Sequence, residues 1–442
     1  MQIKLSDHFT YGKLLRFTVS SILMMIFTSI YSVVDGFFVS NFVGKTPFAA
    51  VNFIMPVLMI LGAVGFMFGT GGGALVAKTM GEGKKEKANE QFSLFVYASV
   101  VCGIVLAVLG IVFMRPIAEV LGAEGEMLEN CVLYGRIILA ALPAFMLQME
   151  FQSFFITAEK PQLGLAVTVA AGVTNMMLDA LLVAVLQWGL VGAALATALS
   201  QIVGGAIPFF YFLRPNKSLL RLGKTHYDGR ALRKACSNGA SELMSNISMS
   251  LVGILYNAQL LKYAGENGIA AYGVLMYVSM IFNAVFIGYA IGVAPVVSYH
   301  YGAQNQKELK GLLRKSIVII GIFSVCMFAL SEVLAEPLSR LYVGYDAALL
   351  ELTCRGFFFF SFAFLFMGMA IYGSSFFTAL NDGLTSALIS FLRTMVFQVA
   401  AVLLLPLIWE IDGVWISIVA AEVMAVIMTV LFLMLKRKKY QY

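Results

Sequence analysis

Charged residues are scarce in this chain. Only 12% of its 442 residues are Asp, Glu, Lys or Arg, whereas 60% are hydrophobic and the mean hydropathy is +0.88. A soluble domain is typically about 25% charged and about 45–50% apolar. Apolar stretches of about 20 residues, enough to cross a bilayer core, recur along the sequence with no long polar block between them. The composition therefore excludes a soluble domain attached to the membrane by a single anchoring helix. It indicates one domain that crosses the membrane many times.

Cysteine and histidine are also sparse, and their positions argue against several chemistries. The five cysteines are scattered without a CxxC pair, so we expect neither a disulfide framework nor a zinc site. The three histidines, His8, His226 and His300, lie in or near polar segments and form no set with a nucleophile or a metal ligand. We therefore expect no enzymatic activity and no cofactor.

A phosphate-binding loop is missing as well. The glycine-rich stretch "GTGGGALVAKT" (69–79) is not followed by Gly-Lys-Ser/Thr at the required spacing. It ends a predicted membrane helix, where small residues favour close helix packing or a flexible gate. Because no nucleotide site is apparent, we expect any transport by this chain to be driven by an ion gradient.

The apolar runs predict an all-α membrane protein with twelve transmembrane helices. Marking each run between polar breaks gives spans at 14–40, 47–77, 91–115, 130–155, 162–186, 191–213, 237–262, 269–298, 315–335, 349–376, 385–408 and 413–435.

The basic residues lie mostly on one side of these spans. If the termini and the even-to-odd loops share a side, that side collects 23 of the 30 Lys and Arg residues. Positive residues stay cytoplasmic, so we expect a multi-pass protein of the inner (plasma) membrane with both termini in the cytoplasm. This distribution explains the net charge of +6 without nucleic acid. The basic central loop is also suited to contact anionic lipid headgroups, which we treat as incidental here.

The second half of the sequence repeats the first at a constant shift of 221 residues. Matching pairs include Gly44/Gly265, Gly81/Gly302, Trp188/Trp409 and Gly192/Gly413. Each half has six spans and starts on the same side, so the repeats run parallel, related by a pseudo-two-fold axis along the membrane normal. Transporters built this way place the substrate site between the halves and alternate its access. We predict an N-lobe at 1–213, a cytoplasmic link at 214–236 and a C-lobe at 237–442.

Polar residues that occur in only one half are candidates for function. Under the shift, Asp35 corresponds to Tyr256, Asn175 to Val396 and Asp179 to Ala400. Counting 1.5 Å per residue from the cytoplasmic side puts Asp35 roughly 28 Å and Asp179 roughly 25 Å into the membrane. Asn175 is one turn below Asp179 on the same helix face, and Thr197 is about 9 Å below the outer surface. The heights permit these four residues to meet.

Two carboxyl groups that share a buried site oppose each other's ionisation, so such a pair is suited to bind and release a proton. With an amide and a hydroxyl they would alternatively offer Na⁺ an oxygen cage formed by Asp35, Asn175 and Asp179. Ionisable residues in membrane helices mark ion or substrate paths. The competing interpretation is that one of the acids pairs with Arg136, which lies at a compatible height.

Other charges in the spans are weaker candidates. Glu242, near the start of the seventh helix, and Glu422, nearer mid-membrane in the twelfth, are possible cavity or substrate residues together with Arg136. Arg355 and Arg393 are expected to be helix-packing partners of acids. We expect Glu150 to lie at the interface, near the inner end of the fourth helix.

These features resemble the multidrug and toxic compound extrusion (MATE) transporters over almost the whole chain, and more specifically their DinF/MepA-like bacterial branch. The resemblance rests on the parallel twelve-helix repeat and on five segments: "YSVVDGFFVS", "TNMMLDALLV", "VGAALATALSQ", and "GEGKKEKAN" with its counterpart "YGAQNQKELK". It implies an antiporter that exports amphipathic, often cationic, organic compounds in exchange for H⁺ or Na⁺. It also implies an N-lobe ion site of Asp35, Asn175, Asp179 and Thr197.

The chain departs from some of these relatives in two respects. They bend the first helix at a proline, but this sequence has none before Pro47. It also lacks an aspartate in the seventh helix, where Glu242 is the only early acid. The alternative function is a flippase for a lipid-linked saccharide, which usually carries more basic residues in its cavity. The expected partners are a small organic substrate and the bilayer, and we expect the protein to act as a monomer.

Overall fold

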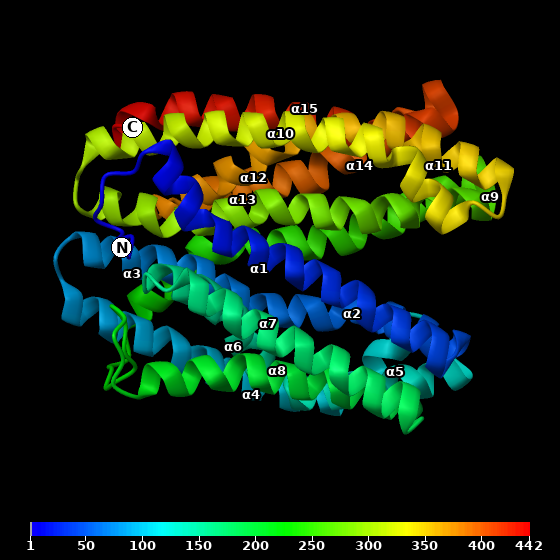
Figure 1. The fold of residues 1–442 in the computed structure, drawn as a ribbon, viewed down its shortest axis with the longest axis horizontal. Coiled ribbons are helices and arrows are strands. Elements are labelled where there is room, and N and C mark those ends of the chain that lie inside the picture. The colour runs from blue at the N-terminus through cyan, green and yellow to red at the C-terminus, as the bar shows by residue number, and fades with distance from the viewer. Residues whose placement is uncertain (1) are drawn as a thin grey trace.

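The computed structural model describes residues 2–442, and over that range the chain consists of helices and connecting segments without a strand. The helices form two bundles that lie side by side (Figure 1). The N-half bundle contains α1 (Tyr11–Phe38), α2 (Lys45–Met67), α3 (Gly73–Gly81), α4 (Lys85–Val120), α5 (Gly125–Ala140), α6 (Leu142–Thr157), α7 (Pro161–Leu178) and α8 (Gly189–Leu213). Short π-helical segments extend α1 (η1, Val39–Val43), join α2 to α3 (η2, Phe68–Gly72) and extend α7 (η3, Asp179–Val185).

The C-half bundle repeats this arrangement. It contains α9 (Gly229–Gly302), α10 (Gln306–Val343), α11 (Ala347–Phe360), α12 (Phe364–Ala379), α13 (Gly383–Phe391), α14 (Phe397–Leu404) and α15 (Pro406–Tyr440). A 3₁₀ turn (η4, Ser361–Ala363) joins α11 to α12, and a π segment (η5, Leu392–Val396) joins α13 to α14.

The twelve predicted spans are confirmed. Ten continuous helical stretches are long and apolar enough to cross a membrane, and the bent pair α5 and α6 makes an eleventh. The twelfth comes from α9, whose 74 residues would reach roughly 110 Å if straight, far more than the bilayer needs. This helix turns at Gly265, where φ is +63° and the backbone is not helical.

Two boundaries differ from those read in the sequence. The span expected at 130–155 is broken at Ala141, where α5 and α6 meet at 59°. Pro143 lies in the first turn of α6, a position that proline favours because its missing N–H is not needed there. The other difference is that α9 begins at Gly229, inside the stretch that was expected to be a link.

The internal repeat is visible in the backbone. Gly44 and Gly265 both have positive φ, at 125° and 63°, and they occupy matching positions between the first and second spans of each half. A second matching pair marks where the bundles touch. A Cβ on Gly81 would lie 2.0 Å from the carbonyl oxygen of Tyr299, and one on Gly302 would lie 2.0 Å from that of Lys78. Lys78 and Tyr299 are also 221 residues apart. Each half therefore contributes the same glycine and the same backbone carbonyl to a contact that is symmetric between the halves.

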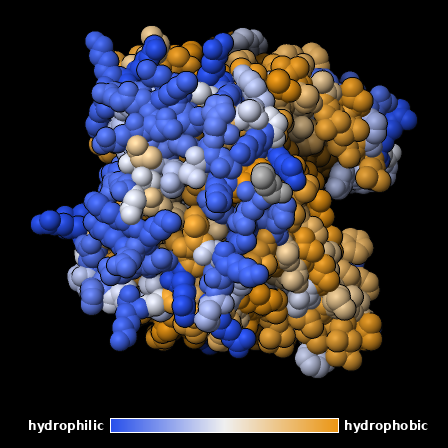
Figure 2. All heavy atoms as spheres, turned by 60° about the vertical axis from the view of Figure 1, so that its left-hand side comes forward, coloured by the Kyte–Doolittle hydropathy of each residue, from blue (hydrophilic) through white to orange (hydrophobic). Residues whose placement is uncertain are grey.

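Buried side chains of the two bundles form a shared core at one end of the molecule. One cluster of buried apolar residues contains side chains of both halves, such as Phe95 and Phe151 with Tyr289 and Phe377. Two further clusters are confined to one half each, and they lie toward the opposite end. The joined end carries both termini (Figure 1) and is covered with hydrophilic side chains, whereas apolar side chains dominate the rest of the visible surface (Figure 2). We call it the basic end, since it holds the lysine-rich segments.

The N-terminal segment reinforces this junction. Its backbone N–H at Leu5 donates to Glu159 Oε1 of the N-half over 2.6 Å, and its N–H at Phe9 donates to Glu308 Oε1 of the C-half over 2.8 Å. Both apolar side chains are completely buried. The segment therefore ties the two bundles together at the basic end.

Candidate functional site

Three of the four polar residues singled out in the N-half form one hydrogen-bonded chain. Thr197 Oγ1 on α8 lies 3.3 Å from Asp35 Oδ1 on α1 and donates to it. Asn175 Nδ2 on α7 donates to Thr197 Oγ1 over 3.5 Å. The same hydroxyl lies 3.2 Å from the carbonyl oxygen of Ala193, so its single proton has two acceptors within reach. Three helices thus converge on Asp35.

Asp179 completes this group, which we call the N-half polar cluster (Asp35, Asn175, Asp179 and Thr197). Its side chain is fully buried, and neither carboxyl oxygen has a hydrogen-bond donor among residues 2–442. The segment η3, which Asp179 begins, packs against α1, the helix that carries Asp35. Two carboxylates only accept hydrogen bonds, so a bond between them requires a proton on one of the two. The oxygens of the two acids would therefore be satisfied by one shared proton, or by a cation bound between them.

The cluster also offers oxygen ligands beyond the two acids. Asn175 is buried, and its Oδ1 has no donor in the described part of the chain. No group of three His, Cys, Asp or Glu side chains suitable for a transition metal occurs within residues 2–442. The donor set of carboxylate, amide and hydroxyl oxygens is instead the kind that hard cations take.

Irregular helix geometry accompanies both acids. Asp179 is the first residue of the π segment η3, and the π segment η1 begins four residues after Asp35. The π geometry of η1 is seen where the N–H of Gly44 donates to the carbonyl oxygen of Val39, five residues earlier, over 3.4 Å. Single π turns inside α-helices are frequent at functional sites. The first helix has no proline, and this irregular turn is its only departure from α geometry between residues 11 and 43.

Two tyrosines beside the cluster were missed in the sequence. Tyr31 lies one turn before Asp35 on α1, and its ring packs against Gly172 of α7. Tyr134 on α5, a helix that packs against α8, is buried, and its hydroxyl has no hydrogen-bond partner among residues 2–442. The spacing of Tyr31 from Asp35 was a usable signal. Nothing in the sequence indicates which face of α5 turns toward α8, so Tyr134 could not have been found.

The matching region of the C-half holds a different polar group. Arg393 donates from Nε and Nη2 to the carboxylate of Glu422 over 2.9–3.1 Å, and Glu422 is 1% exposed. These positions correspond to Gly172 and Gln201 in the N-half. At the counterpart of Asp35, the ring of Tyr256 stacks on Tyr272 with centroids 5.4 Å apart. The C-half thus carries an ion pair that neutralises itself.

The remaining candidates do not join the N-half polar cluster. Arg136 is exposed and donates to the carbonyl oxygen of Ile111 over 3.2 Å, so its proposed pairing with an acid of the cluster is wrong. Glu422 is engaged by Arg393, and Glu242 lies half-buried on α9 without a side-chain hydrogen bond or ion pair among the described residues. Arg355 pairs with Asp412, so both arginines expected to partner acids do so.

Glu150 lies elsewhere than expected. It was predicted at the interface, but it is completely buried in α6, and its carboxyl oxygens have no hydrogen-bond donor within residues 2–442. Its backbone lies against the π segment of the second span, where a Cβ on Gly69 would come within 2.8 Å of the Glu150 carbonyl oxygen. The helix is therefore held against the bundle core and not at the surface.

The fold and the N-half polar cluster define a membrane transporter of two parallel six-helix bundles. The sequence profile of the MatE family matches residues 20–181 and 243–404, one match in each half. The chain belongs to the MatE family, whose members are transporters and not enzymes. The resemblance inferred from the motifs, including the MepA-like branch, is confirmed.

Individual relatives agree with this assignment. The chain is 24% identical over 440 residues to the multidrug export protein MepA of Staphylococcus saprophyticus, covering 96% of this chain and 94% of the relative. It is 27% identical over 319 residues to MepA of Staphylococcus haemolyticus, covering 72% and 70%. Among solved structures, a MATE transporter in complex with MaL6 superposes with a TM-score of 0.93 at 21% identity, with 98% of each chain covered. An outward-facing multidrug resistance MATE transporter gives 0.90 at 22% identity, with 98% and 97% covered. At these identities the solved structures establish the fold.

Proposed function

We propose that this protein is an ion-coupled antiporter that exports amphipathic or cationic organic compounds, including drugs, in exchange for H⁺ or Na⁺. The observation that carries the proposal is the pair Asp35 and Asp179, which no cationic side chain neutralises within the described residues. Burying such a pair without a bound proton or cation is costly. The names of the MepA relatives support multidrug export as the activity.

In this proposal the N-half polar cluster is the site of the coupling ion. Asp35 and Asp179 hold the proton or Na⁺, Thr197 donates to Asp35, and Asn175 orients Thr197 and supplies a further oxygen. A bound proton or Na⁺ and a cationic substrate would both neutralise the negative charge of Asp35 and Asp179. Binding of one therefore weakens binding of the other. Entry of the ion then favours release of the substrate.

The remaining predictions about topology belong to the same proposal. Two lobes, at 1–213 and 237–442 with a link at 214–236, alternate access to a cavity between them. The basic end faces the cytoplasm, with both termini there, in the inner (plasma) membrane. The shared core at the basic end and the separate cores at the other end support an outward-open state. The protein acts as a monomer with a small organic substrate and the bilayer as partners.

The alternative of a lipid-linked saccharide flippase finds little support. Such a function needs free cations in the central cavity to bind phosphate groups. The three membrane arginines are engaged elsewhere: Arg136 by the Ile111 carbonyl, Arg355 by Asp412 and Arg393 by Glu422.

The test is drug transport into inverted membrane vesicles, with a pH gradient and a Na⁺ gradient imposed separately. We expect one gradient alone to drive accumulation of a cationic dye without ATP. Accumulation that needs ATP and ignores both gradients would contradict the proposal. Transport of a lipid-linked saccharide but of no dye would favour the flippase.

A further inference from the structure

A groove on the N-half bundle is not explained by the transport cycle. It lies at the basic end, where α7 begins and α8 ends, and encloses a volume of ≈ 830 Å³. Pockets of about 300–1,000 Å³ are typical of small-molecule sites. Its lining consists of Lys160, Leu163, Ala206, Ile207, Phe210, Tyr211, Arg214, Pro215, Asn216 and Lys217.

The groove is apolar along the membrane and cationic at its rim. Ile207 and Phe210 on α8 are 45% and 54% exposed, on a helix that crosses the bilayer. The rim carries Lys160, Arg214 and Lys217. None of these three cations makes an ion pair with a carboxylate in the described part of the chain.

The nearest acid does not cancel this charge. Glu159 precedes Lys160 in the turn between α6 and α7, and its Oε1 accepts the Leu5 N–H over 2.6 Å. Among residues 2–442, the one hydrogen bond of Lys160 Nζ is to the side-chain oxygen of Gln2, at 3.4 Å. Lys160 lies immediately before the first turn of α7, at the positive end of the helix dipole.

The rim is held in place by the segment after α8. Asn216 Nδ2 donates to the carbonyl oxygens of Tyr211 and Arg214, and its Oδ1 accepts from the N–H and hydroxyl of Ser218. Leu220 and Leu222, which follow, are 0% and 3% exposed. Arg214 and Lys217 therefore project from an ordered turn.

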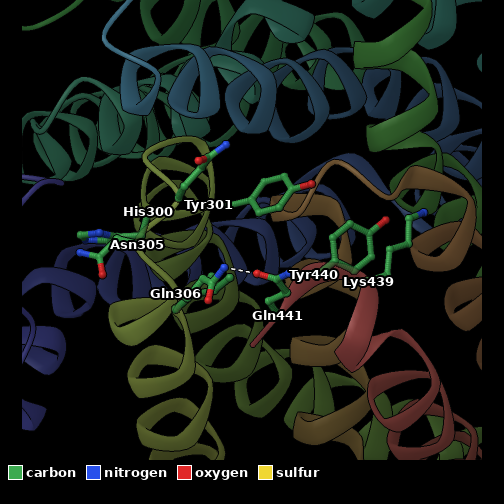
Figure 3. Close-up of a pocket in the computed structure, with 9 residues that line it drawn as sticks. His300, Tyr301, Asn305, Gln306, Lys439, Tyr440 and Gln441 are labelled. Carbon is green, nitrogen blue, oxygen red and sulfur yellow. Dashed lines mark hydrogen bonds between the residues drawn. The ribbon is translucent and has the colours of Figure 1, made fainter.

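The matching corner of the C-half is built differently. There the carboxylate of Asp382 neutralises Lys436 at 3.6 Å and accepts a hydrogen bond from Tyr440 over 2.7 Å. The pocket beside it, of ≈ 300 Å³, is bridged by a hydrogen bond from Gln306 to Gln441 and lined mostly by polar side chains (Figure 3). Of these two matching regions, the one in the N-half combines basic side chains without an ion pair and an exposed apolar groove.

We propose that this groove binds an anionic phospholipid of the adjacent leaflet. The phosphate lies among Lys160, Arg214 and Lys217, and an acyl chain follows Leu163, Ile207 and Phe210. Each cation near a membrane surface contributes about 1 kcal/mol to the attraction of anionic lipid. The apolar wall excludes a free phosphate or a nucleotide as the preferred ligand, because neither would cover the exposed Ile207 and Phe210.

Native mass spectrometry of the purified full chain tests this inference. The probes are phosphatidylglycerol, phosphatidylcholine of the same chain length, and soluble glycerol phosphate. We expect the protein to retain phosphatidylglycerol in preference to the other two. Equal retention of phosphatidylcholine would overturn the role of the cations, and equal binding of glycerol phosphate would overturn the role of the apolar track.

Matched variants locate the site. Removing the rim charges with Lys160→Gln, Arg214→Gln and Lys217→Gln is expected to weaken phosphatidylglycerol binding roughly fivefold per cation. The control Lys307→Gln, Lys310→Gln, Arg314→Gln removes the same charge from exposed positions of α10. The variant Ala206→Trp keeps every charge but fills the groove, and it should also lose the lipid. If the control weakens binding as much as the rim variant, or if Ala206→Trp binds normally, the inference is wrong.

Discussion

The two halves of this protein share a backbone plan but carry opposite kinds of polar group. In the N-half, Asp35 and Asp179 belong to one polar cluster, and neither forms an ion pair with a basic residue among residues 2–442. In the C-half, Arg393 and Glu422 neutralise each other through three hydrogen bonds. The two charges of an ion pair neutralise each other, whereas the charge of two neighbouring acids is neutralised only when a proton or a metal cation binds. This difference between the halves is what we expect if, as proposed, the N-half binds the coupling ion and the C-half provides a fixed scaffold.

The largest expected effect comes from removing the acids of the N-half. Asp35→Asn and Asp179→Asn should each lower dye efflux to background, because an amide cannot take up a proton and binds a cation poorly. Both variants should insert and remain as stable as the original, since the amides carry no charge to be neutralised. Efflux and melting temperature are measured on the same preparations. The C-half variant Tyr256→Phe, at the position matching Asp35, is the control and should retain efflux.

The C-half should respond in the opposite way. Glu422→Gln removes the buried acid that neutralises the half-buried Arg393, and breaking such a pair costs up to about 3–5 kcal/mol of stability. The double replacement Arg393→Leu with Glu422→Leu should recover most of that loss, because apolar residues often substitute for a buried pair without penalty. Thermal unfolding in detergent measures both. If the double variant is stable but exports nothing, the C-half pair is part of the transport site and the comparison fails.

A smaller effect tests the symmetry of the contact between the bundles. Gly81→Ala and Gly302→Ala each place a Cβ against a backbone carbonyl of the other half, 2.0 Å away before relaxation. Both should lower stability by similar amounts, about 1–3 kcal/mol, as overpacking does. Gly321→Ala, which meets nothing within 4 Å, is the matched control and should not destabilise the protein. Unequal losses at the two positions would show that the junction is asymmetric.

The smallest effect concerns the corner turns at the basic end. Burial opposes ionisation of Asp382, but hydrogen bonds from Tyr440 and Thr385 and the charge of Lys436 hold its pKa below the ordinary value. Burial raises the pKa of Glu159 at the N-half corner, against the hydrogen bond from Leu5 and the charge of Lys4.

The two corners should therefore respond to pH with opposite signs. Asp382 has a lower pKa in the folded state than in the unfolded state, so it stabilises the fold at pH values above its unfolded-state pKa. That contribution is lost as the pH falls through its folded-state pKa. Glu159 has a higher pKa in the folded state, so its contribution is present below its unfolded-state pKa and is lost as the pH rises through its folded-state pKa. Asp382→Asn should lower the melting temperature by a few degrees near neutral pH and converge with the original at acid pH. Glu159→Gln should show the reverse trend, and parallel curves would contradict both assignments.

Much of this architecture was predictable because it depends on length and periodicity. The lengths of the apolar runs predicted twelve membrane-spanning helices, and the constant shift of 221 residues predicted two parallel repeats. The height of Asp35, Asn175, Asp179 and Thr197 followed from the rise per residue. These quantities are one-dimensional, so counting along the chain is enough to obtain them.

Features that depend on the rotation of a helix were not predictable. Arg136 has a height compatible with the acids, but its side chain lies on the exposed face of α5, whereas Tyr134 two residues earlier turns inward. Glu150 near a helix end gave no sign that its face is buried against Gly69. The bend at Ala141 was also missed, since Pro143 permits either a helix start or a surface turn.

The most direct test of the central claim is ion movement driven by substrate in proteoliposomes. Vesicles are loaded with a cationic dye, and internal pH and Na⁺ are followed as the dye leaves. The account predicts that dye exit through the original protein moves one of the two ions inward, and that Asp35→Asn and Asp179→Asn abolish this ion movement. Ion exchange at the original rate in both variants would contradict the assignment of the N-half polar cluster as the coupling site.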